Sequence, residues 1–238
     1  MRIPRIFLPV PLAPDTLVTL DSTAANHVTR VLRLKPGAEL VLFNGEGGEY
    51  PAVLEAAATA RLGMWRAVEC ESPLEITLVQ GISRAERMDY TIQKAVELGV
   101  TRIVPVFAAR SVVELRGERL QRRMQHWQGV VIGACEQCGR NRIPTLDVAV
   151  DLSYWLRVPE TPSLRLVLNH RATTTLNALP RPTALTLLIG PEGGLDESEL
   201  AQAERAGFIG MRLGPRVLRT ETAAVTALAA LQTLWGDF

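Results

Sequence analysis

Apolar and polar positions follow two different rhythms along the chain, and the rhythm changes at Ser72-Pro73. Before this point, short apolar runs of strand length alternate with turn residues such as Asn44-Gly45. After it, apolar runs alternate with longer stretches of helical period. We therefore predict a small β-rich domain over residues 1–72 and an α/β domain over residues 73–238, in which a mostly parallel sheet is covered on both faces.

The first domain is predicted to contain four strands and one helix. The strands are expected at Ile6–Leu8, Glu39–Phe43, Tyr50–Glu55 and Met64–Glu69. The helix is expected from about Thr23 to Leu34. Asp21 or Ser22 is its candidate N-cap, and Pro36-Gly37 ends it.

The second domain is predicted to alternate strands with helices. The strands are expected at Ile76–Gly81, Arg102–Phe107, Leu164–Leu168, Leu185–Ile189 and Met211–Leu213. The helices are expected at Met88–Leu98, Glu118–Cys138, Thr174–Leu179, Asp196–Ala206 and Glu221–Trp235. Asp196 with Glu199 three residues later forms a capping-box pattern, which supports the start of the fourth helix.

Composition narrows the class of protein. With 238 residues, 47% hydrophobic and 21% charged, the chain has the ordinary mix of a globular protein with a sizeable core. No apolar run reaches the ~18 residues needed to cross a bilayer. Prolines at positions 4, 9, 11 and 14 would interrupt a signal peptide, and three cysteines are too few for a disulfide framework. We expect a cytoplasmic protein that does not contact membranes.

The net charge of +1 hides two basic segments. Residues 1–35 carry a net charge of +3 and residues 110–142 carry +4. Of the 26 basic residues, 24 are arginines, which suit bidentate contacts with phosphate. His27, Arg30 and Arg33 would share one face of the predicted helix and form a strip for phosphates. The alternatives are a compositional bias that explains the number of arginines and a solvated helix face in place of the strip.

Two motifs could in principle bind a metal or a phosphate, but their context favours a purely structural role. Cys135-Glu-Gln-Cys138 has the spacing of half a zinc site, but Cys70 is the only other cysteine, and the motif closes a predicted helix. We interpret it as two half-buried thiols and expect no metal. Gly45–Gly48 lacks the GxGxxG spacing and lies between two predicted strands, which indicates a hairpin turn. No P-loop, GxSxG or HExxH motif occurs.

Two glycine-containing loops are better candidates for a binding site. Ile189–Gly194 follows a fully apolar strand, and its three glycines would let the backbone approach a ligand closely. Leu213–Thr222 also joins a strand to a helix, and Arg219 lies at the start of that helix, where a cation is disfavoured. We interpret this charge as one held for a substrate. The alternative is a surface ion pair between Arg219 and Glu221.

These two loops resemble the cofactor-binding segments of the SPOUT (α/β-knot) methyltransferases, and more narrowly those of the RsmE family, the 16S rRNA (uracil-N3)-methyltransferases. The resemblance runs along nearly the whole chain. Its other segments are Arg5–Phe7, His27–Leu34, Pro36-Gly37, Gln93–Val100 and Cys135–Arg142. One departure is Asn169–Arg171, which reads Asn-His-Arg where the family usually has a His-Pro or similar pair.

The resemblance implies both a fold and a function. The fold would be a PUA-like β-barrel followed by a SPOUT methyltransferase domain with a deep C-terminal trefoil knot. The function would be S-adenosylmethionine-dependent methylation of N3 of a specific uridine in 16S rRNA, the 1498 site in standard rRNA numbering. The substrate would be the assembled small ribosomal subunit, and the enzyme would be a homodimer.

The resemblance also implies roles for individual residues. Cofactor binding is assigned to Leu168, Asn169, Ile189, Gly190, Pro191, Glu192, Gly193, Gly194, Leu213, Gly214, Val217, Leu218 and Thr220. Candidate catalytic residues are Arg219, Arg140 and Arg142. RNA binding is assigned to Arg2, Arg5, His27, Arg30, Arg33 and Arg110.

Two other functions stay open from the sequence. One is a SPOUT enzyme with a different target, the ribose 2′-O or guanine N1. The other is a ribosome-associated RNA-binding protein without catalysis, which would explain the basic segments but not the pair of glycine-containing loops.

Overall fold

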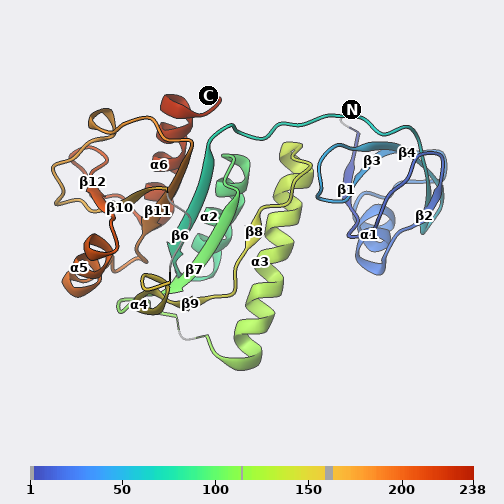
Figure 1. The fold of residues 1–238 in the computed structure, drawn as a ribbon. Coiled ribbons are helices and arrows are strands. Elements are labelled where there is room, and N and C mark those ends of the chain that lie inside the picture. Colours follow the sequence, from blue (N-terminus) through green and yellow to red (C-terminus); the bar gives the residue numbers. More distant parts are fainter. Residues whose placement is uncertain (1–2, 114, 159–162) are drawn as a thin grey trace. The chain divides into compact units, whose positions relative to one another are not determined.

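The computed structural model describes residues 3–113, 115–158 and 163–238 (Figure 1). No helix in this part of the chain combines the length and the apolar character needed to cross a bilayer. Arg2, one of the predicted RNA-binding residues, lies outside the described residues.

The residue contacts divide the chain into two compact units. The first unit is Met1–Glu71 together with Ile132–Ile143, and the second is Ser72–Val131 together with Pro144–Phe238. The segment from Ile132 to Ile143 thus packs with the first unit, although it follows the predicted boundary in the sequence. The boundary after residue 72 stays a prediction for the limits of the two domains.

Among the described residues, the first unit contains a five-stranded sheet in the order β1-β3-β4-β5-β2. β1 runs parallel to β3, and the other neighbouring strands are antiparallel. The strands are β1 (Arg5–Phe7), β2 (Leu17–Thr19), β3 (Glu39–Phe43), β4 (Tyr50–Ala56) and β5 (Thr59–Leu62). The predicted positions of β1, β3 and β4 are confirmed to within one residue, and glycines with positive φ turn the chain between β3 and β4.

The strand predicted at Met64–Glu69 is wrong. The strand lies earlier, at β5, and Gly63 follows it directly. Arg66 forms only an isolated bridge with Glu49, so the apolar residues around it do not extend the sheet. β2 is short and mostly exposed, and it was not predicted, although its Leu17 and Val18 are apolar.

The helix predicted at Thr23–Leu34 forms in two shorter parts. These are α1 (Ser22–Asn26) and the π-helix η1 (His27–Val31). The Asp21 side chain caps α1 as predicted, accepting a first-turn backbone N–H at 2.8 Å. Arg33 lies beyond the helix with a φ of 54°, so it does not continue the helical face.

One buried cluster holds the first unit together. The apolar side chains of β1, β3, β4 and β5 pack against α1 and η1. Val28, Leu42 and Leu54 belong to this cluster and are fully buried. Burial of each such side chain stabilises the fold by about 1.5–3 kcal/mol.

Among the described residues of the second unit, six strands form the order β12-β10-β11-β6-β7-β8, and β9 pairs with β7. All of these pairs are parallel, as the sequence predicts. The strands are β6 (Glu75–Gly81), β7 (Arg102–Phe107), β8 (Thr145–Leu146), β9 (Val150–Asp151), β10 (Leu164–Leu168), β11 (Ala184–Ile189) and β12 (Ile209–Met211). The very short β8 and β9 were not predicted, and β12 begins two residues before its predicted start.

The helices alternate with these strands along the chain. They are α2 (Ala85–Glu97), α3 (Gly117–Cys138), α4 (Leu152–Trp155), the 3₁₀ turn η2 (Leu176–Ala178), α5 (Glu197–Arg205) and α6 (Thr220–Trp235). The last turns of α3, from Ile132, belong to the first unit. Asp196 and Glu199 form the predicted capping box at the start of α5.

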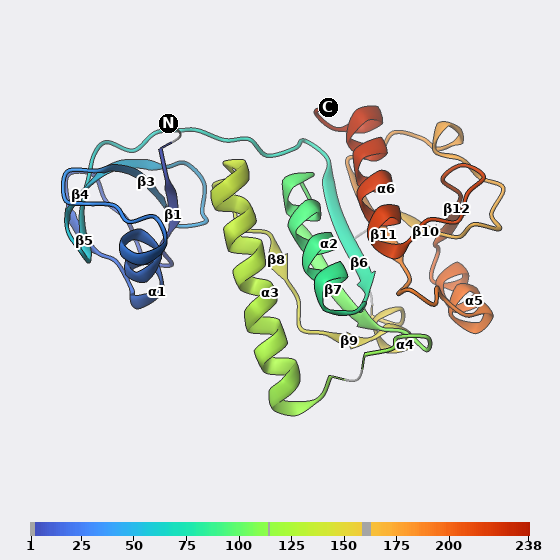
Figure 2. The same ribbon diagram turned by 180° about the vertical axis from the view of Figure 1, so that it is seen from behind.

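Helices cover both faces of the parallel sheet. α2 and α6 pack together on one face, in front of the sheet in Figure 2. On the other face, strand residues such as Val79 and Leu188 pack with Trp155 of α4 and with Ala203 and Phe208 around the end of α5. Because both faces are covered, five residues of β11 in succession are buried.

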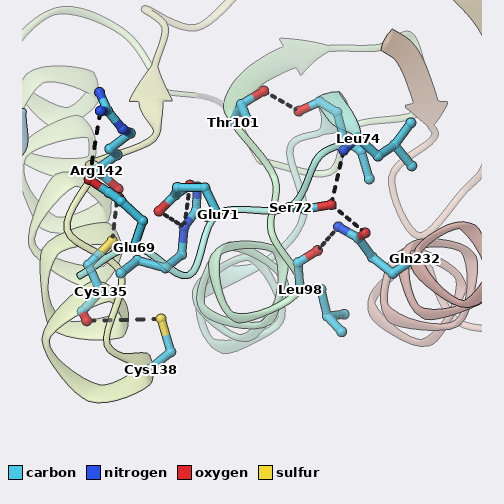
Figure 3. A network of polar contacts seen from close by, with 12 residues as sticks. Glu69, Glu71, Ser72, Leu74, Leu98, Thr101, Cys135, Cys138, Arg142 and Gln232 are labelled. Atoms are coloured by element: carbon cyan, nitrogen blue, oxygen red, sulfur yellow. Dashed lines mark hydrogen bonds and ion pairs between the residues drawn. The ribbon is translucent and has the colours of Figure 1, made fainter. Parts of the chain in front are cut away.

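A buried glutamine ties the end of α6 to the beginning of the second unit. The Gln232 Nε2 atom donates to the Leu98 carbonyl at 2.7 Å, and the Ser72 hydroxyl donates to Gln232 Oε1 at 2.7 Å (Figure 3). Gln232 is fully buried, so both of its polar ends are satisfied within the protein. Ser72, the first residue of the predicted linker, is therefore held in place. The trefoil knot stays a prediction.

Candidate functional site

A pocket of the second unit lies where three neighbouring parallel strands end. β12, β10 and β11 are adjacent and parallel, so the loops that follow them emerge at the same edge of the sheet. These loops and the first turn of α6 line a pocket of ≈230 Å³. Ligands in α/β folds bind at this edge of the sheet.

The pocket brings together all but one of the predicted cofactor residues. Those in its lining are Leu168, Asn169, Ile189, Gly190, Pro191, Glu192, Gly193, Gly194, Leu213, Val217, Leu218 and Thr220. Gly214 is not in the lining, although it belongs to the same loop and has a φ of +67°. The lining residues that sequence reasoning missed are His170, Leu195, Met211, Arg212, Arg216 and Ala223. Most of them are next to predicted residues in the sequence, so their position beside the two loops is the signal that could have found them.

Three glycines near the pocket leave no room for a side chain. A Cβ at Gly190 would lie 2.8 Å from the Leu195 backbone nitrogen, and one at Gly193 would lie 2.8 Å from Arg110 Cβ. At Gly81, the last residue of β6, it would overlap the backbone of Pro191. Glycine is therefore required at position 193 because Arg110 packs against it. The sequence had suggested a different reason, the close approach of a ligand. Gly81 was missed because a lone glycine at a strand end gives no sequence signal.

Hydrogen bonds connect the two glycine-containing loops to each other and to β6. The Thr220 hydroxyl donates to the Gly190 carbonyl at 2.7 Å. The Gln80 Nε2 atom donates to the Thr220 hydroxyl oxygen at 3.0 Å. Gln80 is fully buried, and its Oε1 atom has no hydrogen-bond partner. The polar side chain of β6 thus holds the start of α6 against the loop that follows β11.

Glu192 and Glu221, one from each loop, point to the same arginine of α2. Glu192 Oε1 accepts a hydrogen bond from the Arg84 backbone N–H at 2.9 Å and lies 3.3 Å from Arg87 Nη1. Glu221 Oε1 lies 4.0 Å from Arg87 Nε. The alternative ion pair between Arg219 and Glu221 is therefore wrong, because Glu221 pairs with Arg87 instead.

Arg219 occupies the N-cap position of α6. Its side chain is exposed and does not cap the helix. Within the described residues it forms no ion pair, although it lies between two pocket-lining residues, Leu218 and Thr220. An unpaired cation at a helix N-terminus opposes the helix dipole. The position therefore supports a role toward a negatively charged group.

The other two candidate catalytic arginines belong to the first unit. The Arg140 side chain is 4% exposed, and its Nε atom donates to both Glu71 oxygens at 3.0 and 3.1 Å. Burial lowers the pKa of Arg140, but the hydrogen bond and charge of Glu71 outweigh it and raise that pKa above its usual value. Arg142 is more open, with its side chain 57% exposed and Nη2 3.7 Å from Glu69 Oε1 (Figure 3).

The predicted RNA-binding residues have dissimilar surroundings. The Arg5 side chain is 10% exposed, pairs with Glu49 and donates to Asn141. His27 is half-buried, while Arg30 and Arg33 are exposed. Because the helix is a π-helix and ends at Val31, the common face predicted for His27, Arg30 and Arg33 is wrong.

Arg110, also predicted to bind RNA, lies at the edge of the pocket. Its side chain is exposed, and Nη1 donates to the Gly193 carbonyl at 3.2 Å. The neighbouring Ala109 backbone N–H donates to Glu199 Oε1 at 2.7 Å. The loop that carries Arg110 is thus anchored to α5 and packs against the loop that follows β11.

The cysteines lie in the first unit. Cys135 is buried, and this burial raises its pKa to about 12, so its thiol stays protonated at neutral pH. Cys138 is half-buried and Cys70 is exposed. Among the described residues, no group of three or more His, Cys, Asp or Glu side chains could hold a metal ion.

Comparison with known proteins identifies the family. A family model described as an RNA methyltransferase domain matches residues 70–232, and one described as an RNA methyltransferase PUA domain matches residues 20–61. A protein named ribosomal RNA small subunit methyltransferase E from Buchnera aphidicola (Acyrthosiphon pisum) is 34% identical, over 100% of this chain and 96% of its own length. Its namesake from Mycobacterium bovis is 35% identical, over 93% of this chain and 88% of its own length. The chain belongs to the ribosomal RNA small subunit methyltransferase E family.

Solved structures agree with this family assignment. A putative methyltransferase from Legionella pneumophila, in complex with the bound cofactor SAM, is 41% identical with a TM-score of 0.97. A ribosomal RNA small subunit methyltransferase E from Neisseria gonorrhoeae, bound to S-adenosyl methionine, is 40% identical with a TM-score of 0.93. Each alignment covers 100% of both chains. In this methyltransferase E family member, the whole pocket falls within the match to the methyltransferase domain.

Proposed function

We propose that this protein uses S-adenosylmethionine to methylate N3 of a single uridine in 16S rRNA, at the 1498 site in standard rRNA numbering. The proposed substrate is the assembled small ribosomal subunit. The observation that carries the proposal is the pocket where β10, β11 and β12 end, built by the two glycine-containing loops. Family membership supports the methyl transfer, and the relatives' names support rRNA of the small subunit as the substrate.

The pocket residues suit S-adenosylmethionine. The lining combines apolar side chains such as Leu168, Ile189 and Leu218 with backbone groups of the glycine-containing loops. Apolar walls suit the adenine ring, and backbone N–H and C=O groups can bind the polar atoms of the ligand. A Cβ at Gly190 would collide with the backbone of Gly194 and Leu195, so the tight path of this loop requires glycine there. When bound, the cofactor supplies an electrophilic methyl group on a sulfonium centre.

Arg219 is the residue we propose to act on the base. Loss of the N3 proton spreads negative charge over O2 and O4 of uracil, and a guanidinium placed beside the base stabilises such charge. Arg219 fits because it is exposed, unpaired among the described residues and next to the pocket lining in sequence. Arg142 stays a second candidate because its side chain is largely exposed. Arg140 fits less well, because Glu71 already binds its guanidinium.

The first unit is proposed to bind the RNA. The match to an RNA methyltransferase PUA domain supports this task. Arg30 and Arg33 are exposed and available to phosphates. Arg5 is nearly buried and paired with Glu49, so we propose that it stabilises the RNA-binding surface and does not contact the phosphates. In the second unit, Arg110 would contact RNA at the edge of the pocket.

The decisive experiment combines cofactor binding with analysis of the product. Calorimetry should show that S-adenosylmethionine binds the parent protein and not Gly193→Val, whose added side chain would collide with Arg110. Purified small subunits that lack the modification should then gain N3-methyluridine at one position. A 2′-O-methylated nucleoside or N1-methylguanosine would identify the other SPOUT activities instead. RNA binding without cofactor binding would favour the ribosome-associated factor.

A homodimer, a trefoil knot and a cytoplasmic location complete the proposal. The dimer is tested by sedimentation at micromolar concentration, where a mass of twice 26.1 kDa is expected. A monomer with full activity would contradict it. An experimental structure with the cofactor would test the knot, because it would trace the path of the chain through the loops around β10, β11 and β12.

A further inference from the structure

The two loops that line the pocket share one cation from outside the pocket. Arg87 lies in the first turn of α2 and is not a lining residue. Its guanidinium contacts Glu192, from the loop after β11, and Glu221, at the start of α6. We propose that Arg87 is a positioning residue that sets the separation of the two loops and thereby the affinity of the pocket for the cofactor.

The carboxylates of Glu192 and Glu221 lie in partly buried positions, where the charge of Arg87 affects both of them. The side chains of Glu192 and Glu221 are 17% and 16% exposed, so water screens their charges only partly. The Oε2 atom of each is buried and has no hydrogen-bond partner. Glu192 accepts hydrogen bonds through its Oε1 atom alone, and Glu221 has, in the part of the chain that the structure describes, only the ion pair of its Oε1 atom with Arg87. Within the described residues, Arg87 is the only cationic side chain that pairs with either of them.

Removal of this cation would leave two like charges next to the pocket. Glu192 would keep the backbone N–H of Arg84, but Glu221 would lose its ion-pair partner. Like charges in a partly buried site repel, and the loop backbones that carry them would move apart. The hydrogen bond between Thr220 and Gly190 would resist this movement, so we expect a looser pocket in a folded protein.

The shape of the guanidinium explains why an arginine occupies the position. Different nitrogens contact the two acids, Nη1 for Glu192 and Nε for Glu221. A lysine carries its charge on a single atom and could approach one carboxylate closely but not hold both in this geometry. Arg87→Lys should therefore recover only part of the function lost in Arg87→Met.

The test compares Arg87→Met with Arg84→Met, a matched control. Arg84 is on the same turn, is exposed and contacts Glu192 only through its backbone, which the substitution keeps. We expect Arg87→Met to raise the Kd for S-adenosylmethionine about 5- to 30-fold, which corresponds to 1–2 kcal/mol. Arg84→Met should change it less than about twofold, and Arg87→Lys should lie between. Equal affinities of Arg87→Met and Arg84→Met would overturn the proposal.

We call the pairing of Arg87 with both Glu192 and Glu221 the clamp. A second measurement tests the clamp without the cofactor. The inference rests on the proposed function only for the identity of the ligand. Hydrogen exchange on the free protein should show faster exchange in the two loops of Arg87→Met, with α5 unchanged. If the parent binds no S-adenosylmethionine but this pattern appears, the proposed function fails and the clamp stands. Unchanged exchange in the loops would refute the clamp.

A double substitution separates positioning from general destabilisation. If repulsion between the two acids loosens the loops, Glu221→Gln should partly restore cofactor affinity to Arg87→Met. In the parent protein, the same Glu221→Gln should not improve affinity. If Arg87→Met does not fold, Arg87→Met/Glu221→Gln must fold for the proposal to hold. Purely additive effects of the two substitutions would contradict it.

Discussion

Two arginines of the first unit and two of the second have opposite surroundings, although the sequence presents them alike. In the first unit, Arg5 and Arg140, the paired arginines, are nearly buried, and each binds a glutamate. In the second unit, Arg216 and Arg219, the open arginines, are exposed and form no ion pair among the described residues. An arginine that is buried and paired with a carboxylate stabilises the fold. Exposure without a partner leaves the charge available to a ligand.

The physical cost of removing a charge differs between the two groups. A buried ion pair that loses one partner leaves the other charge unsatisfied, which costs about 3–5 kcal/mol. An exposed cation contributes about 0–1 kcal/mol to stability even when it is paired. Stability and activity measurements should therefore separate the paired arginines from the open arginines.

The largest effect on stability is expected from Arg140→Ala. Glu71 would keep its charge in a mostly buried site without its partner, so unfolding free energy should fall by about 3–5 kcal/mol. Urea unfolding followed by circular dichroism measures the change. Arg219→Ala is the control and should stay within about 0.5 kcal/mol of the parent. Similar stabilities of the two variants would remove the distinction between paired and open arginines.

The largest effect on catalysis is expected from Arg219→Ala. Loss of a preorganised charge costs about 10²–10³ in turnover, so single-turnover methyl transfer to small subunits should slow by that factor. Arg219→Lys should recover part of the rate, since it restores the charge without the planar fork. Affinities for cofactor and RNA are measured in parallel. A near-normal rate, or a loss explained entirely by weaker cofactor binding, would show that Arg219 does not act on the base.

A smaller effect is expected from the exposed arginines of the first unit. Replacing Arg30 and Arg33 with alanine should weaken RNA binding and reduce the slope of log K against log salt by about 1.5, because each phosphate contact contributes about 0.7–0.9. Cofactor affinity should not change. Binding titrations between low and moderate salt measure the slope. An unaltered slope would mean that these side chains are solvated and that other groups bind the phosphates.

The smallest effect on stability is expected from Glu136, an acid of the first unit that forms no ion pair among the described residues. Burial raises the pKa of Glu136, whose Oε1 atom accepts the Phe7 backbone N–H at 3.0 Å. A raised pKa favours folding at low pH, and this contribution is lost as pH rises through the folded-state value. Glu136→Gln should thus be slightly more stable at neutral pH, by up to about 0.5 kcal/mol. The difference should vanish below pH 4.5, the usual value, in unfolding measured across pH.

Local patterns in the sequence predicted much of the architecture. β3, β7 and β10 have the predicted bounds, and Asp196 with Glu199 caps α5 as expected. These elements depend on period and capping, which nearby residues determine. The two glycine-containing loops could be predicted for a similar reason, because each directly follows a strand of a parallel sheet.

Other features depend on residues that are distant in sequence. The strand expected at Met64–Glu69 lies at β5 instead, because sheet pairing and not apolar content selects the strand. Gly81 is needed because Pro191 packs against it, and nothing near Gly81 in the sequence indicates that contact. The role of Gln80 similarly depends on its hydrogen bond with Thr220.

The sequence by itself determined the order of the main strands and helices, the two loops and the family, because these are properties of consecutive residues. Only the tertiary structure decided which arginines are paired. Arg140 and Arg219 are equally basic in the sequence, but Glu71 binds one and no acid among the described residues binds the other. Likewise, Glu221 pairs with Arg87 and not with Arg219, which is two residues away. Ion pairing depends on distance and burial in space, which a linear pattern of charges does not contain.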